Sequence, residues 1–217
     1  YVLRMKARTR PTPKPDARAK LLDAAFALIR QQGYAATTVD DLCRAAGVTK
    51  GAFFHHFASK DALAVAAADC WTETTSAFFA AAAYHDHADP LDRVLGYVDF
   101  RLSILQGELS DFTCLVGTMV QEAYATKPDI GAACGASIGG HIDVLTQDIQ
   151  AARAKHAAAG DWTARSLARH MQAVIQGAFI LAKAGGGAEA AAECLHHLRR
   201  YIALLFKQRL PKESQTQ

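Results

Sequence analysis

The residues best suited to chemistry in this sequence stand side by side as Phe53-Phe54-His55-His56-Phe57, within GVTKGAFFHHFASKDAL (47–63). Two adjacent imidazoles could bind a metal, but neighbours on a helix point about 100° apart and no partner ligand is close in the sequence. Phe53 and Phe57 are four residues apart and share one helical face, which suits a buried core. Phe54 and His55 then point elsewhere, so the segment favours contact with a partner, and no metal site is predicted.

The rest of the sequence contains no signature of catalysis. There is no GxSxG, GxGxxG, Walker A or HExxH motif. The five cysteines (43, 70, 114, 134 and 194) are odd in number and show no CxxC spacing, which argues against a disulfide framework or a zinc site. They are interpreted mainly as small buried residues in a reducing compartment. The sequence therefore predicts neither an enzyme nor a cofactor.

Charge is distributed unevenly along the chain. Residues 1–60 carry 11 Lys/Arg and 4 Asp/Glu, whereas residues 61–217 carry 13 and 17. A basic end on a mildly acidic protein favours a polyanionic partner for that end, although a solvated basic tail would give the same pattern. No apolar run is long enough to span a membrane, and no apolar segment follows the basic start, so a cytoplasmic protein is expected.

The elements that must position these residues are helices. Apolar residues repeat at helical spacing from about residue 16 until Gly33. Thr38 and Asp41 form a capping-box pair that starts a short helix, Gly47 ends it, and Thr49 caps a second short helix. Ser59 caps a longer third one. Further helices are predicted near 90–106, 111–125, 128–157, 162–184 and 187–208.

Two short helices joined by a tight glycine turn form a helix-turn-helix. The stretch LLDAAFALIRQQGYAATTVDDLCRAAGVTKGAFFHHFASKDAL (21–63) resembles the DNA-binding domain of the TetR/AcrR family of bacterial repressors. The resemblance implies an all-α fold with an N-terminal three-helix helix-turn-helix domain and a larger helical ligand-binding and dimerisation domain. The expected divisions are a flexible basic arm (1–15), the DNA-binding domain (16–62), the effector and dimerisation domain (63–210) and a polar tail (211–217).

The resemblance also implies roles for residues of the motif. Ala52, Phe54 and His55 would face the major groove, and Gly51 would allow close approach of the backbone. The family usually has tyrosine where Phe54 stands, so Phe54 can contact a thymine methyl but cannot donate to phosphate. Residues expected to hold the phosphate backbone are Thr38, Thr49, Lys50, His56 and Lys60.

Two predictions concern the larger domain. Apolar stripes in the last two helices, read with the resemblance, favour a four-helix dimer interface containing Met171, Ile175, Ala178, Leu195, Leu198, Tyr201, Ile202 and Leu205. Residues unusual in an Ala/Leu core are candidates for a ligand pocket: Trp71, Phe100, Cys114, Met119, His141, Gln176 and Phe179.

The expected function is a homodimeric repressor that binds a palindromic operator in double-stranded DNA and is released by a small-molecule effector. Three alternatives stay open. Cys114, close to a helix N-terminus that would favour the thiolate, could sense oxidants or electrophiles. The chain could regulate through a protein partner without a small-molecule ligand. It could also be a small helical enzyme or ligand carrier.

Overall fold

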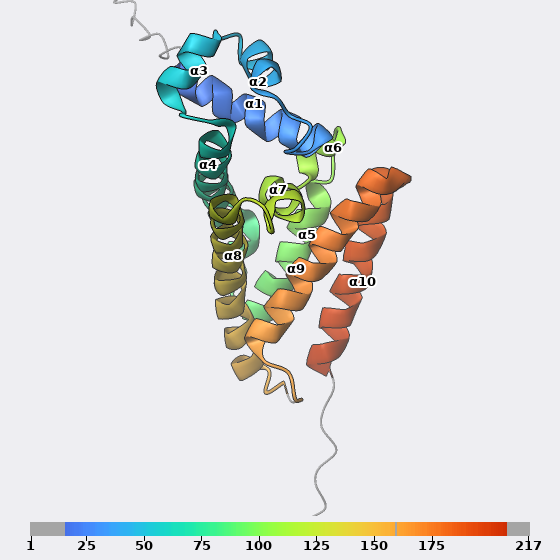
Figure 1. Ribbon diagram of the computed structural model, residues 1–217. Coiled ribbons are helices and arrows are strands. Elements are labelled where there is room, and N and C mark those ends of the chain that lie inside the picture. The colour runs from blue at the N-terminus through green and yellow to red at the C-terminus, as the bar shows by residue number, and fades with distance from the viewer. Residues whose placement is uncertain (1–15, 159, 208–217) are drawn as a thin grey trace, which may run out of the picture.

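The computed structural model describes residues 16–158 and 160–207, and every regular element within them is helical (Figure 1), which confirms the all-α prediction. The predicted arm (1–15) and tail (211–217) lie outside the described residues. We call α1 to α3 the head and the elements from α4 onward the body. In chain order the elements are α1 (Ala17–Gln32), α2 (Val39–Ala46), α3 (Lys50–His56), α4 (Lys60–Ala80), η1 (Ala83–Asp86), α5 (Pro90–Ser103), α6 (Leu109–Phe112), α7 (Leu115–Ala123), α8 (Pro128–Lys155), α9 (Ala164–Leu181), η2 (Ala182–Gly186) and α10 (Gly187–Lys207).

Short polar side chains set the starts of the helices that frame the head. The Asp16 carboxylate accepts the Ala19 N–H at 2.8 Å and caps α1. The Ser59 hydroxyl oxygen accepts the Ala62 N–H at 3.0 Å and caps α4. Each bond satisfies a backbone donor that the first helical turn leaves without a partner. Both starts agree with the pattern expected from the sequence.

The helix predicted over 111–125 is two helices, α6 and α7, and that prediction was wrong. Thr113 between them has an extended backbone (φ −81°, ψ 164°), and its hydroxyl donates to the Leu109 carbonyl oxygen at 2.6 Å. The Cys114 sulfur then accepts the Gly117 N–H at 3.3 Å and caps α7. A side chain that bonds the preceding turn thus ends one helix, and the next residue starts another.

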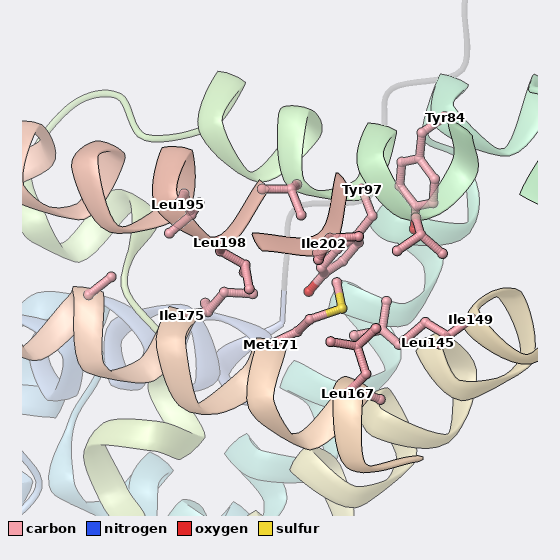
Figure 2. Packing of buried hydrophobic residues seen from close by; sticks show 14 of the residues in the cluster. Tyr84, Tyr97, Leu145, Ile149, Leu167, Met171, Ile175, Leu195, Leu198 and Ile202 are labelled. Atoms are coloured by element: carbon pink, nitrogen blue, oxygen red, sulfur yellow. The ribbon is translucent and has the colours of Figure 1, made fainter. Parts of the chain in front are cut away.

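The body has a core between α5, α8, α9 and α10. Figure 2 shows Met171 and Ile175 of α9 lying against Leu198 and Ile202 of α10. These side chains are at most 2% exposed, so each contributes roughly 1.5–3 kcal/mol by leaving water. The pairing of α9 with α10 is therefore a property of the single chain.

A second core joins the head to the body. Phe53 of the head and Leu63 of α4 are fully buried in the same cluster as Leu115 and Met119 of α7. Figure 1 shows α7 lying beneath α1. The head thus packs on α7. The domain boundary expected between residues 62 and 63 falls inside α4, so this helix continues from the head into the body. No helix in the described part of the chain is long and apolar enough to cross a membrane.

Candidate functional site

The helix-turn-helix is built as its sequence predicts. The Asp41 N–H donates to the Thr38 hydroxyl oxygen at 3.1 Å, and the Thr38 N–H donates to the Asp41 carboxylate at 3.1 Å, which completes the capping box of α2. Gly47 takes the left-handed conformation (φ 64°, ψ 38°), which glycine adopts at little cost, and so turns the chain into α3. Phe53 and Phe57 are 0% and 5% exposed and hold α3 against the head.

The outer face of α3 is left to solvent. Gly51, Phe54 and His55 are exposed, with Phe54 at 55%, whereas Ala52 and His56 are partly covered. One edge of the Phe54 ring contacts the Phe53 ring, 5.1 Å away between centroids, and the rest of it is free to contact a partner. The structure therefore brings the predicted base-facing residues together on one open surface.

The predicted phosphate contacts differ in what their side chains already bind. Both donors of Thr38, its N–H and its hydroxyl, are given to the Asp41 carboxylate, so a phosphate would have to compete with Asp41. The Thr49 hydroxyl oxygen accepts the Ala52 N–H at 3.1 Å, which leaves its own proton available. Lys50 is exposed and pairs with Asp40 at 2.8 Å. Thr49 and Lys50 are thus the better placed donors.

Lys60 has a different environment from the one expected. Its ammonium group donates to the carbonyl oxygens of Tyr34 at 3.0 Å and Thr37 at 2.9 Å, and it lies 4.2 Å from the centre of the Tyr34 ring. Burial, the largest influence, lowers the pKa of Lys60. A phosphate contact by Lys60 stays a prediction, but the described contacts are internal and brace the loop before α2.

The two adjacent histidines are not part of a metal-ligand cluster. The rings of His55 and His56 are 4.9 Å apart and lie edge to face. Within residues 16–158 and 160–207, no three His, Cys, Asp or Glu side chains gather closely enough to hold a metal ion. Chemistry at this surface therefore comes from hydrogen bonds, ring contacts and charge.

Comparison with known proteins agrees with this geometry. The sequence profile of the family described as "Bacterial regulatory proteins, tetR family" matches residues 21–67, which include the whole helix-turn-helix. Residues 21–67 form a TetR-family DNA-binding domain. The chain is therefore a DNA-binding transcriptional regulator, and an enzymatic role is not supported.

The similarity to individual TetR-family proteins extends beyond the head. The HTH-type transcriptional repressor NemR of Escherichia coli is 26% identical over 197 residues, which cover 87% of this chain and 94% of NemR. A crystal structure of reduced E. coli NemR superposes with a TM-score of 0.72 at 25% identity and covers 85% of this chain and 96% of that one. A TetR-family regulator from Agrobacterium tumefaciens superposes with a TM-score of 0.76 at 20% identity, with coverage of 85% and 96%.

The body of this regulator encloses a cavity of about 320 Å³. Five of the seven predicted pocket residues line it: Trp71, Cys114, His141, Gln176 and Phe179. Met119 was wrongly predicted, because it is fully buried in the core shared by head and body. Phe100 was also wrong, since it packs on Phe78 and Phe79 and these two rings form the wall in its place.

A polar network that the sequence did not reveal stands behind one wall. The Tyr97 hydroxyl oxygen lies 2.8 Å from His141 Nε2 and accepts N–H bonds from Arg101 at 2.9 Å and Gln172 at 3.2 Å. Because the Tyr97 oxygen already accepts two N–H bonds, the Tyr97 O–H donates a hydrogen bond to His141 Nε2. The neutral imidazole then carries its own N–H on Nδ1. Burial, and then Arg101, lower the pKa of His141 to about 3, so the ring is neutral.

A second unpredicted group connects the head to the cavity. Arg30, in the last turn of α1, lines the cavity and lies 5.0 Å above the Trp71 ring. A basic residue in the last turn of a helix is ordinary, so nothing in the sequence distinguished Arg30 from a solvated arginine. Only the packing of α1 over the body places its guanidinium group there.

The opposite end of α7 also binds the head. The Glu122 carboxylate accepts the N–H groups of Tyr34 at 3.3 Å and Ala35 at 2.7 Å. Asp61 bonds the Tyr34 hydroxyl and pairs with Lys127 at 2.7 Å. The loop before α2 is therefore held by charged groups of the body, and α7 extends from the cavity at Cys114 to this loop.

Six of the eight residues predicted for a dimer interface are wrong, because their side chains are at most 2% exposed within the single chain. A side chain that is buried in its own chain has no surface left for a partner. Tyr201 is 46% exposed and Leu205 is partly exposed, so both remain available. The six buried residues are Met171, Ile175, Ala178, Leu195, Leu198 and Ile202.

Proposed function

We propose that this chain is a homodimeric repressor that binds a palindromic operator and responds to a small-molecule effector held in the body cavity. One observation carries the proposal: the helix that begins at the cavity, α7, also holds the loop that leads into the helix-turn-helix. NemR, which is similar over most of its length, is described as a repressor. A cavity of about 320 Å³ falls at the lower end of the range found for small-molecule sites.

We assign the contacts with DNA to side chains that are exposed on α3 and to hydrogen-bond donors at its start that remain available. Phe54 and Ala52 present apolar surface suited to thymine methyl groups, and His55 supplies a ring nitrogen for a base edge. Thr49 and Lys50 stand at the start of α3 and suit phosphate, because the first N–H groups of a helix favour anions. Because few side chains on α3 can form hydrogen bonds with base edges, the sequence-dependent shape of the DNA carries part of the specificity.

Effector response is assigned to α7. A ligand can shift DNA affinity only if it binds one arrangement of the head better than another. Cys114, which caps α7, and Val116 within α7 line the cavity. Glu122, near the other end of this nine-residue helix, accepts two backbone N–H groups of the head. A ligand that displaces α7 would therefore strain or break these two bonds and tilt the head.

Dimerisation is assigned to exposed apolar residues on the last two helices. A symmetric dimer lets two heads meet the two halves of a palindrome. The exposed fractions of these large apolar side chains lie between 46% and 60%, so their surface is available to a second chain. The residues are Ile180, Leu181, Tyr201 and Leu204.

The test begins with binding to DNA. Affinity for random duplex DNA should fall steeply as salt rises, and selection from genomic fragments should yield a palindromic site. Lys50→Ala should weaken binding to all sequences alike, whereas His55→Ala should relax the preference at one base pair per half-site by roughly 1–3 kcal/mol. Absence of DNA binding at low salt would refute the proposal, and a uniform loss in His55→Ala would refute the role given to that residue.

A second candidate is a repressor that senses oxidants or electrophiles through Cys114. The observation in its favour is that the Cys114 side chain lines the cavity and also caps α7. Alkylation with iodoacetamide should then lower DNA affinity, and Cys114→Ser should be insensitive to the reagent. Unchanged DNA affinity after alkylation would remove this candidate.

A further inference from the structure

Two arginines line the cavity without an acidic side chain to pair with. Arg30 donates from Nε to the Phe26 carbonyl oxygen at 2.8 Å and from Nη1 to the Asp111 carbonyl oxygen at 3.3 Å. Arg101 donates from Nε to the Tyr97 hydroxyl at 2.9 Å. Neither forms an ion pair with any residue in the ranges 16–158 and 160–207, although Arg93, Arg165 and Arg199 each do.

The remaining donors of both arginines are unused. A guanidinium group carries five N–H bonds, and the contacts above use two on Arg30 and one on Arg101. In the described part of the chain no buried side-chain nitrogen or oxygen lacks a partner, so the nitrogens without a bond, Arg30 Nη2 and both Nη atoms of Arg101, are accessible from the cavity or from solvent. Burial lowers the pKa of Arg30, with an opposing effect from Asp111, which indicates that its charge is poorly solvated.

The acidic residue of the lining, Asp111, acts on the Arg30 charge from a distance but forms no ion pair with it. Asp111 offers Arg30 only its backbone carbonyl, and its carboxylate accepts the Glu108 N–H at 2.8 Å to cap α6. The other polar groups near Arg101 add donors, namely the His141 Nδ1–H and the Gln172 amide. The lining thus holds two arginines against one acidic residue, with polar hydroxyl side chains beside an aromatic wall. The hydroxyl residues are Thr72, Thr74, Thr75, Ser76, Thr113 and Ser137, and the rings are Trp71, Phe78, Phe79, Phe112 and Phe179.

We propose that the effector is a small organic anion, a carboxylate or similar oxyanion on an apolar and preferably aromatic body. Its charged group takes the free guanidinium N–H donors of Arg30 and Arg101, and its body packs on the rings. Arginine suits this task because its fork of donors matches an oxyanion and because it stacks on aromatic faces. The inference rests on the proposed function, in which this cavity is the effector site.

Arg30 gives such an anion a direct effect on the head. It belongs to α1, and its Nη1 bond to the Asp111 carbonyl ties α1 to α6. An anion on the free donors of the same guanidinium group pulls on this tie, so the charge of the effector acts on the DNA-binding head as well as on α7. A neutral ligand of the same shape would fill the cavity without this effect.

The test uses matched pairs of acid and amide. The full chain is titrated by calorimetry with benzoate and benzamide, and with 1-naphthoate and 1-naphthamide, at one ionic strength and near pH 7. We expect the better acid to bind at least about tenfold more tightly than its amide, as charge-assisted hydrogen bonds imply. Arg30→Gln and Arg101→Gln should each weaken acid binding more than amide binding and so reduce this preference. Arg165→Gln is the control, because Arg165 is exposed, pairs with Asp143 and does not line the cavity.

Several results would overturn the inference. They are equal affinity for acid and amide, no binding by either acid, or an acid preference that persists in the double variant. If Arg30→Gln does not fold, Arg30→Lys keeps the charge but loses the fork, and an unchanged acid preference in that variant would exclude Arg30. DNA binding without any ligand tests the proposed function separately. DNA binding without acid binding would remove only this inference, whereas acid binding without any change in DNA affinity would remove the effector role.

Discussion

Replacement of Lys60 by methionine separates an internal role from a DNA contact. Methionine keeps most of the aliphatic stem and removes the ammonium group that donates to the Tyr34 and Thr37 carbonyl oxygens. Hydrogen bonds to charged groups are worth about 1.5–3 kcal/mol each, and the contact with the Tyr34 ring adds about 0.5 kcal/mol. Because Lys60 is only partly buried, we halve the hydrogen-bond contribution and expect a loss of about 2–3.5 kcal/mol in the free energy of unfolding, of which we use the lower end.

The assay combines urea unfolding with a salt titration of DNA binding. For a chain of this size, 2 kcal/mol corresponds to a fall of roughly 4–8 °C in Tm. Lys50→Met is the matched control, because Lys50 is exposed. The free energy of unfolding of this variant should change by less than about 0.5 kcal/mol. The slope of its log DNA affinity against log salt concentration should fall by about 0.9 per head. Lys60→Met should do the reverse. If Lys60→Met leaves stability unchanged and lowers the slope by about 0.9 per head, the internal role is refuted.

Three further predictions follow from the structure. Thr38→Ala should cost about 1 kcal/mol of stability by removing the capping box of α2, and an unchanged urea midpoint would contradict this. Leu204→Glu should shift the protein to monomers in sedimentation velocity, whereas Val144→Glu, at a comparably exposed position on α8, should leave a dimer. If both remain dimers, the dimer face is misassigned. With its pKa lowered from 6.5 to about 3, His141 stays unprotonated in the folded chain while the unfolded chain takes up a proton, so stability falls as pH drops from about 6.5 to about 3. His141→Gln should flatten that fall relative to the original chain, and equal slopes in the two chains would refute the assignment.

Local patterns were enough to predict the head. Thr38, Gly47 and Thr49 act on residues within four positions of themselves, so their types and spacing fix α2, the turn and α3 without any distant contact. The burial of Phe53 and Phe57 followed from helical periodicity in the same way. The break at Thr113 was missed because its hydroxyl bonds the preceding turn, and many threonines do the same inside a continuous helix.

The sequence alone therefore determined the helical class, the helix-turn-helix and the open face of α3, because each depends on residues close together in the chain. The tertiary structure decided which long-range partners those elements meet. It placed Lys60 under the loop at Tyr34 and put Arg30 of the head into the cavity of the body. It also buried Met171, with most of the predicted dimer stripe, inside its own chain. An apolar stripe has the same periodicity whether its partner is a neighbouring helix or a second chain. An arginine near a helix end occupies the same position in the sequence pattern whether its side chain lies in solvent or in a cavity. Only the packing of the helices distinguishes these cases.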